Sequence, residues 1–165
     1  MKIVGSVNWT RDVLPVWKKR NNASNEISAL ADVEWHSCII EENDLDKLWV
    51  AGCCTWTAVY RGHKFKSVAM DAGTDDITVE GEIDESHHRS RIASLQESVL
   101  KGCVFDPIIL IAPSADEDIV IADGNHRALA LYREQDRLSG TDAFIGYGES
   151  IRTYSLYRNA LTYTR

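Results

Sequence analysis

The chain has 165 residues, of which 44% are hydrophobic and 26% are charged, and its formal net charge is −7. This length suits one domain with a real core, and the composition is typical of a globular protein rather than a disordered or fibrous one. The negative charge argues against nucleic acid as a partner, because non-specific DNA binding depends on neutralising phosphates. No apolar run reaches the roughly 20 residues that a membrane-spanning helix needs, and the N-terminus lacks the apolar core of a signal peptide. We therefore expect a cytoplasmic protein with no membrane association.

The first 75 or so residues give few clear signals. A cap at Ser24 predicts a short helix over residues 24–30, and residues 44–49 predict the start of another. Residues 55–60 and 64–70 carry β-branched or alternating apolar side chains on either side of an Arg-Gly turn, which predicts a hairpin. A further strand is expected at residues 77–83.

Tryptophan and cysteine are expected to serve mainly the core. All five tryptophans lie in the first third of the chain, at positions 9, 17, 35, 49 and 56. Core packing is the leading interpretation for most of them, with stacking on a base or a partner as the alternative. The four cysteines, at positions 38, 53, 54 and 103, form no Cys-x-x-Cys pair, so we expect free and mostly buried thiols rather than a zinc site.

The second half of the chain alternates clearly between helix and strand. Helical spacing of apolar residues predicts a helix from Arg89, and Gly102 stands where its C-terminal cap belongs. Two short apolar runs predict buried, adjacent strands at residues 106–112 and 119–122, joined by a polar turn. The expected elements that follow are a helix at 125–138, a strand at 143–147 and a C-terminal helix from residue 149. Together these elements predict a single mixed α/β domain in which helices pack on a mixed sheet.

The residues Asp123, Gly124, Asn125, His126 and Arg127 stand where the second buried strand gives way to a helix. Glycine lets the backbone turn sharply and lets a ligand approach. The unpaired N–H groups of the first helical turn, together with the helix dipole, favour an anion there. A guanidinium at position 127 matches the oxygens of a phosphate, with His126 as a second donor. Gly124 and Asn125 are predicted to belong to the same phosphate-binding loop.

Asp123 does not fit simple phosphate binding, because its carboxylate repels a phosphate. Three uses remain open for it: binding a metal ion, orienting His126, or accepting a proton from a substrate hydroxyl. The plain alternative is also open for the whole loop. Asp-Gly is a common turn, and polar residues in a first helical turn are often merely solvated.

From about residue 89 to residue 137, the chain resembles the ParB/sulfiredoxin superfamily. The resemblance rests on the helix SLQESVLKG, the strand start Asp106-Pro107-Ile108, and a strand leading through DGNHR into an alanine-rich helix, all in the family's order. It covers about a third of the chain and implies a ParB/sulfiredoxin-like core over residues 76–148. The preceding residues 1–75 are left unplaced, and residues 149–165 are expected to form a C-terminal helix.

The branches of this superfamily imply different functions. Sulfiredoxins carry a catalytic cysteine at the position that Asn125 occupies here, so sulfinic acid repair by that route is excluded. ParB partition proteins bind CTP at this loop. The free serine kinase branch has D-G-H-H-R, one residue from the sequence here, and the loop there binds the phosphates of a nucleotide. By motif this branch is the nearest.

In family members an upstream segment faces the loop, and it corresponds here to residues 80–91. Within that segment Glu85 is our candidate general base or metal ligand, and Arg89 or Arg91 is a candidate phosphate contact. The alternative is that these charges only cap the helix that begins near Arg89. A transition-metal site at His87 and His88 is disfavoured, because adjacent side chains diverge. A magnesium ion that arrives with a nucleotide needs only one or two carboxylates.

The leading functional hypothesis is nucleotide-dependent phosphotransfer to a small hydroxyl-bearing molecule. It uses ATP or ADP, with CTP as a further candidate, and catalytic roles for Asp123, Glu85 and His126. The alternative is a non-catalytic nucleotide-responsive interaction module that works through a protein partner. A ParB-like nuclease is less favoured because of the negative charge.

Overall fold

The two apolar runs of the second half form adjacent strands in the middle of a mixed β-sheet in the computed structural model. The structure describes residues 1–18, 30, 32–51, 64–71, 85–134 and 137–162. Strand β4 (Ile108–Ala112) is buried along its whole length, and β5 (Ile119–Asp123) is buried up to its last residue. The strands pair antiparallel, with Leu110 opposite Ile121. The prediction of two buried, adjacent strands is confirmed.

The sheet has six strands in the described part of the chain, in the order β1-β2-β6-β4-β5-β3. The edge strands are β1 (Lys2–Ser6) and β3 (Leu48–Val50), and β2 (Glu34–Ile39) and β6 (Asp142–Tyr147) complete the order. β4 runs parallel to β6 and β5 runs parallel to β3, whereas the other three pairings are antiparallel. The predicted mixed α/β domain is confirmed. Three of its strands, β1, β2 and β3, lie within the first 75 residues. The sequence analysis predicted no strand at these three positions.

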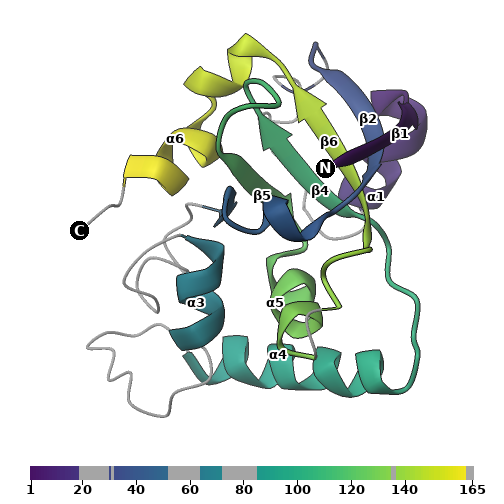
Figure 1. The fold of residues 1–165 in the computed structure, drawn as a ribbon, viewed down its shortest axis with the longest axis vertical. Coiled ribbons are helices and arrows are strands. Elements are labelled where there is room, and N and C mark those ends of the chain that lie inside the picture. The colour runs from purple at the N-terminus through teal and green to yellow at the C-terminus, as the bar shows by residue number, and fades with distance from the viewer. Residues whose placement is uncertain (19–29, 31, 52–63, 72–84, 135–136, 163–165) are drawn as a thin grey trace.

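Three helices cover one face of the sheet: α3 (Phe65–Asp71), α4 (Glu85–Leu100) and α5 (Asn125–Arg133). Figure 1 shows α5 between the sheet and α4, which is the outermost element on this side. The buried stretch from Ala128 to Leu131 joins the strand residues in this half of the core. The helix α4 ends as predicted. Gly102 has φ 75°, its N–H donates to the Val99 carbonyl, and the next N–H donates to the Ser98 carbonyl.

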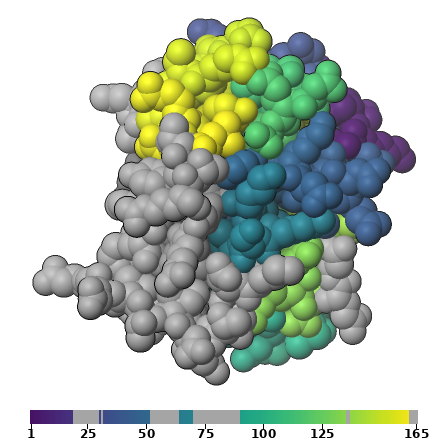
Figure 2. Space-filling model, turned by 60° about the vertical axis from the view of Figure 1, so that its left-hand side comes forward, coloured from purple at the N-terminus to yellow at the C-terminus, as the bar shows by residue number. Residues whose placement is uncertain are grey.

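The opposite face is covered by a π-helical turn η1 (Trp9–Val13), by α1 (Leu14–Lys18) and by α6 (Ser155–Thr162). Figure 2 shows α6 at the top of the molecule and α4 and α5 at the bottom, with α3 and the β3 region between them. Core packing is confirmed for four of the five tryptophans. These four are buried in this half of the core. Trp9 stacks on Trp35 with ring centroids 5.0 Å apart, and the other two are Trp17 and Trp49. Trp56 lies outside the described residues.

Several sequence-based boundaries are wrong. Residues 44–49 do not start a helix: a 3-10 turn η3 (Glu42–Asp44) is followed by β3. The strand predicted at residues 64–70 is the helix α3, because Phe65, Val68 and Ala69 share one buried helical face. The helix predicted at 125–138 ends at Arg133. The C-terminal helix is split into η4 (Glu149–Thr153) and α6 by the extended residue Tyr154. The elements predicted at 24–30, 55–60 and 77–83 fall almost wholly outside the described residues.

The first residue of the chain is anchored in the fold. The α-amino group of Met1 lies 2.7 Å from a carboxylate oxygen of Asp44 and 3.0 Å from one of Glu41. Burial alone lowers the pKa of this amino group, but the hydrogen bonds to Asp44 and Glu41 outweigh that effect, so its pKa is raised above 8. The start of the chain is therefore held against the segment that precedes β3.

The cysteine prediction holds in part. Cys38 is free and buried, and burial raises the pKa of its thiol to about 12, so it stays protonated and unreactive. Cys103 is also free but is exposed beyond the end of α4. Cys53 and Cys54 lie outside the described residues. In those parts of the chain that the structure covers, no helix is long and apolar enough to cross a membrane.

Candidate functional site

The turn from β5 into α5 depends on glycine at position 124. Gly124 has φ 97°, in the left-handed region, and it separates the last residue of β5 from the first residue of α5. A Cβ atom there would lie 2.9 Å from Nη2 and 3.2 Å from Cζ of Arg127. The guanidinium therefore lies against the glycine backbone, and both the conformation and the space exclude a larger residue without a shift.

Arg127 fastens this turn to the beginning of β4. Its side chain is 5% exposed. Nη1 donates to the carbonyl oxygens of Asp106 and of Pro107, the latter at 3.2 Å. Nη2 donates to Oδ2 of Asp123 at 2.7 Å. The sequence suggested that this guanidinium faces a phosphate, and the structure directs these donors into the protein.

The Asp123 carboxylate compensates the positive charge of the nearly buried Arg127 side chain. Its side chain is 12% exposed, and it pairs with Arg127 across one helical turn. A buried charge is costly unless it is paired and hydrogen-bonded, and this pair meets both conditions. The structure thus adds a use for Asp123 that the sequence analysis did not weigh. Its charge is balanced locally, so it repels an anion less than an isolated carboxylate would.

Asn125 is buried, and its amide spans two strands. Oδ1 accepts the backbone N–H of Ala51 at 3.1 Å, and Nδ2 donates to the Ile121 carbonyl at 3.3 Å. Ala51 directly follows the last residue of β3. The side chain that the sequence placed among the phosphate contacts is therefore engaged with the ends of β3 and β5.

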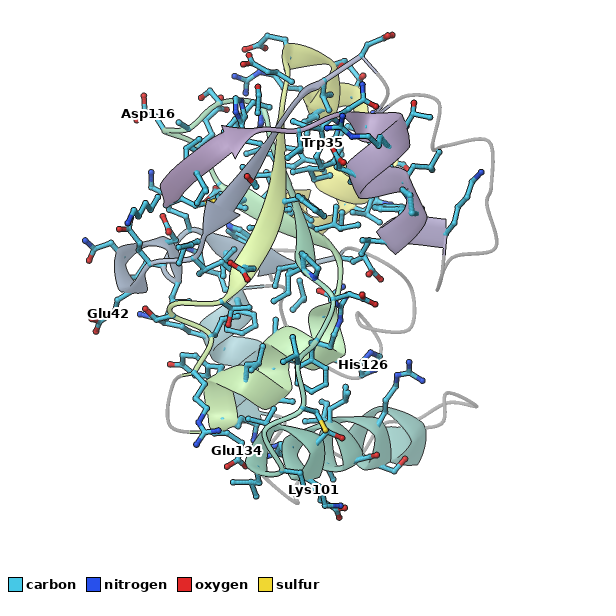
Figure 3. The ribbon with its side chains drawn as sticks, turned by 90° about the vertical axis from the view of Figure 1, so that its right-hand side faces the viewer. Trp35, Glu42, Lys101, Asp116, His126 and Glu134 are labelled. Atoms are coloured by element: carbon cyan, nitrogen blue, oxygen red, sulfur yellow. The ribbon has the colours of Figure 1, made fainter. Side chains whose placement is uncertain are left out.

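The start of α5 has the backbone geometry of a helix that follows a left-handed glycine. The first α-helical bond at this end joins the Ala128 N–H to the Gly124 carbonyl at 2.8 Å. In any α-helix the N–H groups of the first turn lie before such a bond and have no carbonyl four residues earlier within the helix. His126 is half-buried in this first turn, and Figure 3 labels it near one end of α5, with Glu134 beyond the other. The turn therefore combines helix N–H groups with an imidazole.

The upstream candidates all lie on α4. Glu85 is its first residue and Arg89 follows one turn later, and the side chains of both are outside the description. Arg91 is exposed. A hydrogen bond between α4 and α5 joins Gln96 to Glu134 at 2.9 Å, at the end of α5 remote from the loop. The structure thus brings together Asp123, Gly124, Asn125 and Arg127, and it leaves the facing role of the α4 residues a prediction.

Among the side chains that the structure describes, no three of His, Cys, Asp or Glu gather closely enough to hold an ion. The side chains of His87 and His88 do not belong to that set.

A hollow of about 770 Å³ lies elsewhere, between the β4–β5 turn and α6. Arg152 at its edge is ion-paired with Glu117 and Glu149, and Tyr157 donates from its hydroxyl to the Asp118 carbonyl at 3.1 Å. The sequence gave no signal for this hollow, because its lining comes from three separated parts of the chain with ordinary surface residues. The lining carries both signs of charge: Lys47, Asp116, Glu117, Asp118, Arg152 and Arg158 are its charged members.

Comparisons of the chain with protein-family models, with curated proteins and with solved structures find no match in any of the three.

Proposed function

We propose that this chain binds the phosphates of a nucleotide at the start of α5 and transfers a phosphoryl group to a small hydroxyl-bearing molecule. The observation that carries the proposal is the turn at Gly124, which has φ 97° and no side-chain cap and which starts α5 directly after a buried strand. Oriented N–H groups and the helix dipole favour a phosphate at such a turn. The order of residues in DGNHR supports the same function through its resemblance to the free serine kinase branch of the ParB/sulfiredoxin superfamily.

In this proposal the backbone and His126 contact the phosphates, and Arg127 acts by shaping the loop. The guanidinium holds the turn in place through Asp123 and through two carbonyl groups, so the N–H groups need no rearrangement when a phosphate binds. Positioning and charge neutralisation supply most of the catalysis in phosphoryl transfer. Glu85 as base, Arg89 or Arg91 as phosphate contacts and a Mg²⁺ ion brought in with ATP or ADP complete the proposed site.

A thermal-shift screen tests nucleotide binding. ATP, ADP, CTP and GTP are each added with and without magnesium, and a ligand that binds the folded state raises the melting temperature by mass action. At a nucleotide concentration 100 times the Kd, the stabilisation is about 2.7 kcal/mol. No shift with any of the four at millimolar concentration would refute the proposal.

Turnover is tested with Asp123→Asn, once a labelled phosphate has shown transfer by the parent. An asparagine can still accept a hydrogen bond from Arg127, but it can neither take a proton nor neutralise a metal ion. The substitution also leaves the Arg127 charge unbalanced, so turnover is compared under conditions in which urea unfolding shows the variant to be folded. If Asp123 is catalytic, turnover of the folded variant should fall about 10²-fold or more, while nucleotide affinity stays close to that of the parent. Equal turnover in the two proteins would end the catalytic role of Asp123.

One observation favours a second function, a non-catalytic nucleotide-responsive module. The Asp123 carboxylate already lies 2.7 Å from the Arg127 guanidinium, an arrangement that needs no catalytic role to account for the aspartate. Nucleotide binding by the parent without any product from a labelled γ- or β-phosphate would select this function. The nuclease alternative stays disfavoured by the net charge of −7.

A further inference from the structure

Ala51, the residue that follows β3, is held against the loop by a hydrogen bond to Asn125. Within β3 and β5 the parallel pairing ends at Val50 and Ile121. Ala51, one residue later, no longer belongs to β3, although β5 continues to Asp123 before Gly124 leads into α5. The Asn125 amide links this residue to β5: its Oδ1 accepts the Ala51 N–H at 3.1 Å, and its Nδ2 donates to the Ile121 carbonyl at 3.3 Å.

This contact uses an acceptor and a donor on two different atoms of one side chain. Oδ1 accepts and Nδ2 donates, and asparagine is the shortest side chain that carries the two on separate atoms. Asn125 is 8% exposed and Ala51 is 4% exposed, so each would lose a hydrogen bond in a place that water replaces poorly. A cysteine or alanine at this position cannot make the same pair of bonds.

The loop is thus anchored on two sides by two different side chains. Arg127 ties it to the start of β4, and Asn125 ties it to the end of β3. We propose that Asn125 is a positioning residue rather than a phosphate ligand, and that it fixes the end of β3 beside the phosphate-binding N–H groups of α5. This inference rests on the proposed function, because it deepens the account of that same site.

The test is nuclear magnetic resonance of the full chain, first without any variant. In the nucleotide-free parent the Ala51 N–H should exchange slowly with solvent. On addition of ADP, and separately of inorganic pyrophosphate, the backbone N–H signals of His126 and Arg127 should move. The side-chain amide signals of Asn125 and the protection of Ala51 should stay as they were. A direct ligand would behave in the opposite way, because its amide must leave Ala51 to reach a phosphate.

Asn125→Ala then removes the contact. We expect the Ala51 N–H to exchange at least about tenfold faster and ADP affinity to fall about tenfold, as happens when a binding loop loses its pre-organisation. Ser37→Ala is the matched control, since it removes one side-chain-to-backbone hydrogen bond, to Gly5 at the far edge of the sheet. It should leave ADP affinity unchanged even where its melting temperature falls.

The outcomes separate this inference from the function on which it rests. Fast exchange of Ala51 in the free parent, or ADP-induced shifts of the Asn125 amide, would overturn the positioning role alone. Equal ADP affinities of Asn125→Ala and Ser37→Ala would also overturn the positioning role alone. A parent whose signals do not respond to ADP or pyrophosphate would overturn the proposed function, and the positioning role with it.

Discussion

Replacing Arg127 with alanine should be among the most destabilising single changes in this protein. The substitution leaves the Asp123 carboxylate, 12% exposed, without the guanidinium that lies 2.7 Å away. It also removes the donor that serves the carbonyls of Asp106 and Pro107. Deleting one partner of a buried ion pair costs about 3–5 kcal/mol. A typical domain has only about 5–15 kcal/mol of total stability.

Arg152→Ala is the matched control for this prediction. Arg152 also pairs with two carboxylates, those of Glu117 and Glu149, but its side chain is 47% exposed. Exposed ion pairs contribute about 0–1 kcal/mol each, so removing both pairs of Arg152 should cost less than removing the buried pair of Arg127. The two substitutions delete the same side chain with similar numbers of partners, and they differ mainly in burial.

The assay is urea unfolding followed by tryptophan fluorescence. The buried tryptophans report loss of the core, and the free energy follows from the midpoint and the slope of the transition. A loss below about 1 kcal/mol in Arg127→Ala, or one no larger than in Arg152→Ala, would show that the pair adds nothing beyond a surface ion pair. It would remove the reason for assigning Arg127 a shaping role in the loop.

Three further predictions concern other parts of the fold. Gly124→Ala should cost about 1–3 kcal/mol in urea unfolding, because a non-glycine residue is strained at φ 97°, and a loss near zero would mean that the loop relaxes freely. The pKa of the Met1 amino group is higher in the folded than in the unfolded protein. The ion pairs of this group therefore stabilise the fold fully below about pH 8, the unfolded pKa, and this stabilisation is lost as the pH rises through the folded pKa. Melting temperatures of untagged parent and Asp44→Asn should therefore converge above pH 8, and a constant difference would contradict the linkage. Trp49 has an indole N–H with no acceptor among the described residues, whereas that of Trp35 is hydrogen-bonded, so Trp49→Phe should destabilise less than Trp35→Phe in the same unfolding assay.

The sequence by itself determined the strands and the turn around the candidate site. Two short apolar runs predict β4 and β5, because only a buried strand accommodates so few residues that are nearly all apolar. The glycine at 102 marks the end of α4, and the glycine at 124 marks the turn into α5. These signals are local: each depends on residues within about one turn or one strand of each other.

The tertiary structure alone decided what the polar residues of the loop contact. Arg127 reaches residues about 20 positions earlier in the chain, and Asn125 reaches Ala51, 74 positions earlier. No local pattern encodes such distant partners, so sequence reasoning assigned both side chains to a ligand. The same reason explains the edge strands and α3. β1 and β3 are short and are stabilised by pairing with distant strands, and residues 65–71 become helical because that conformation buries Phe65 and Val68 against the core.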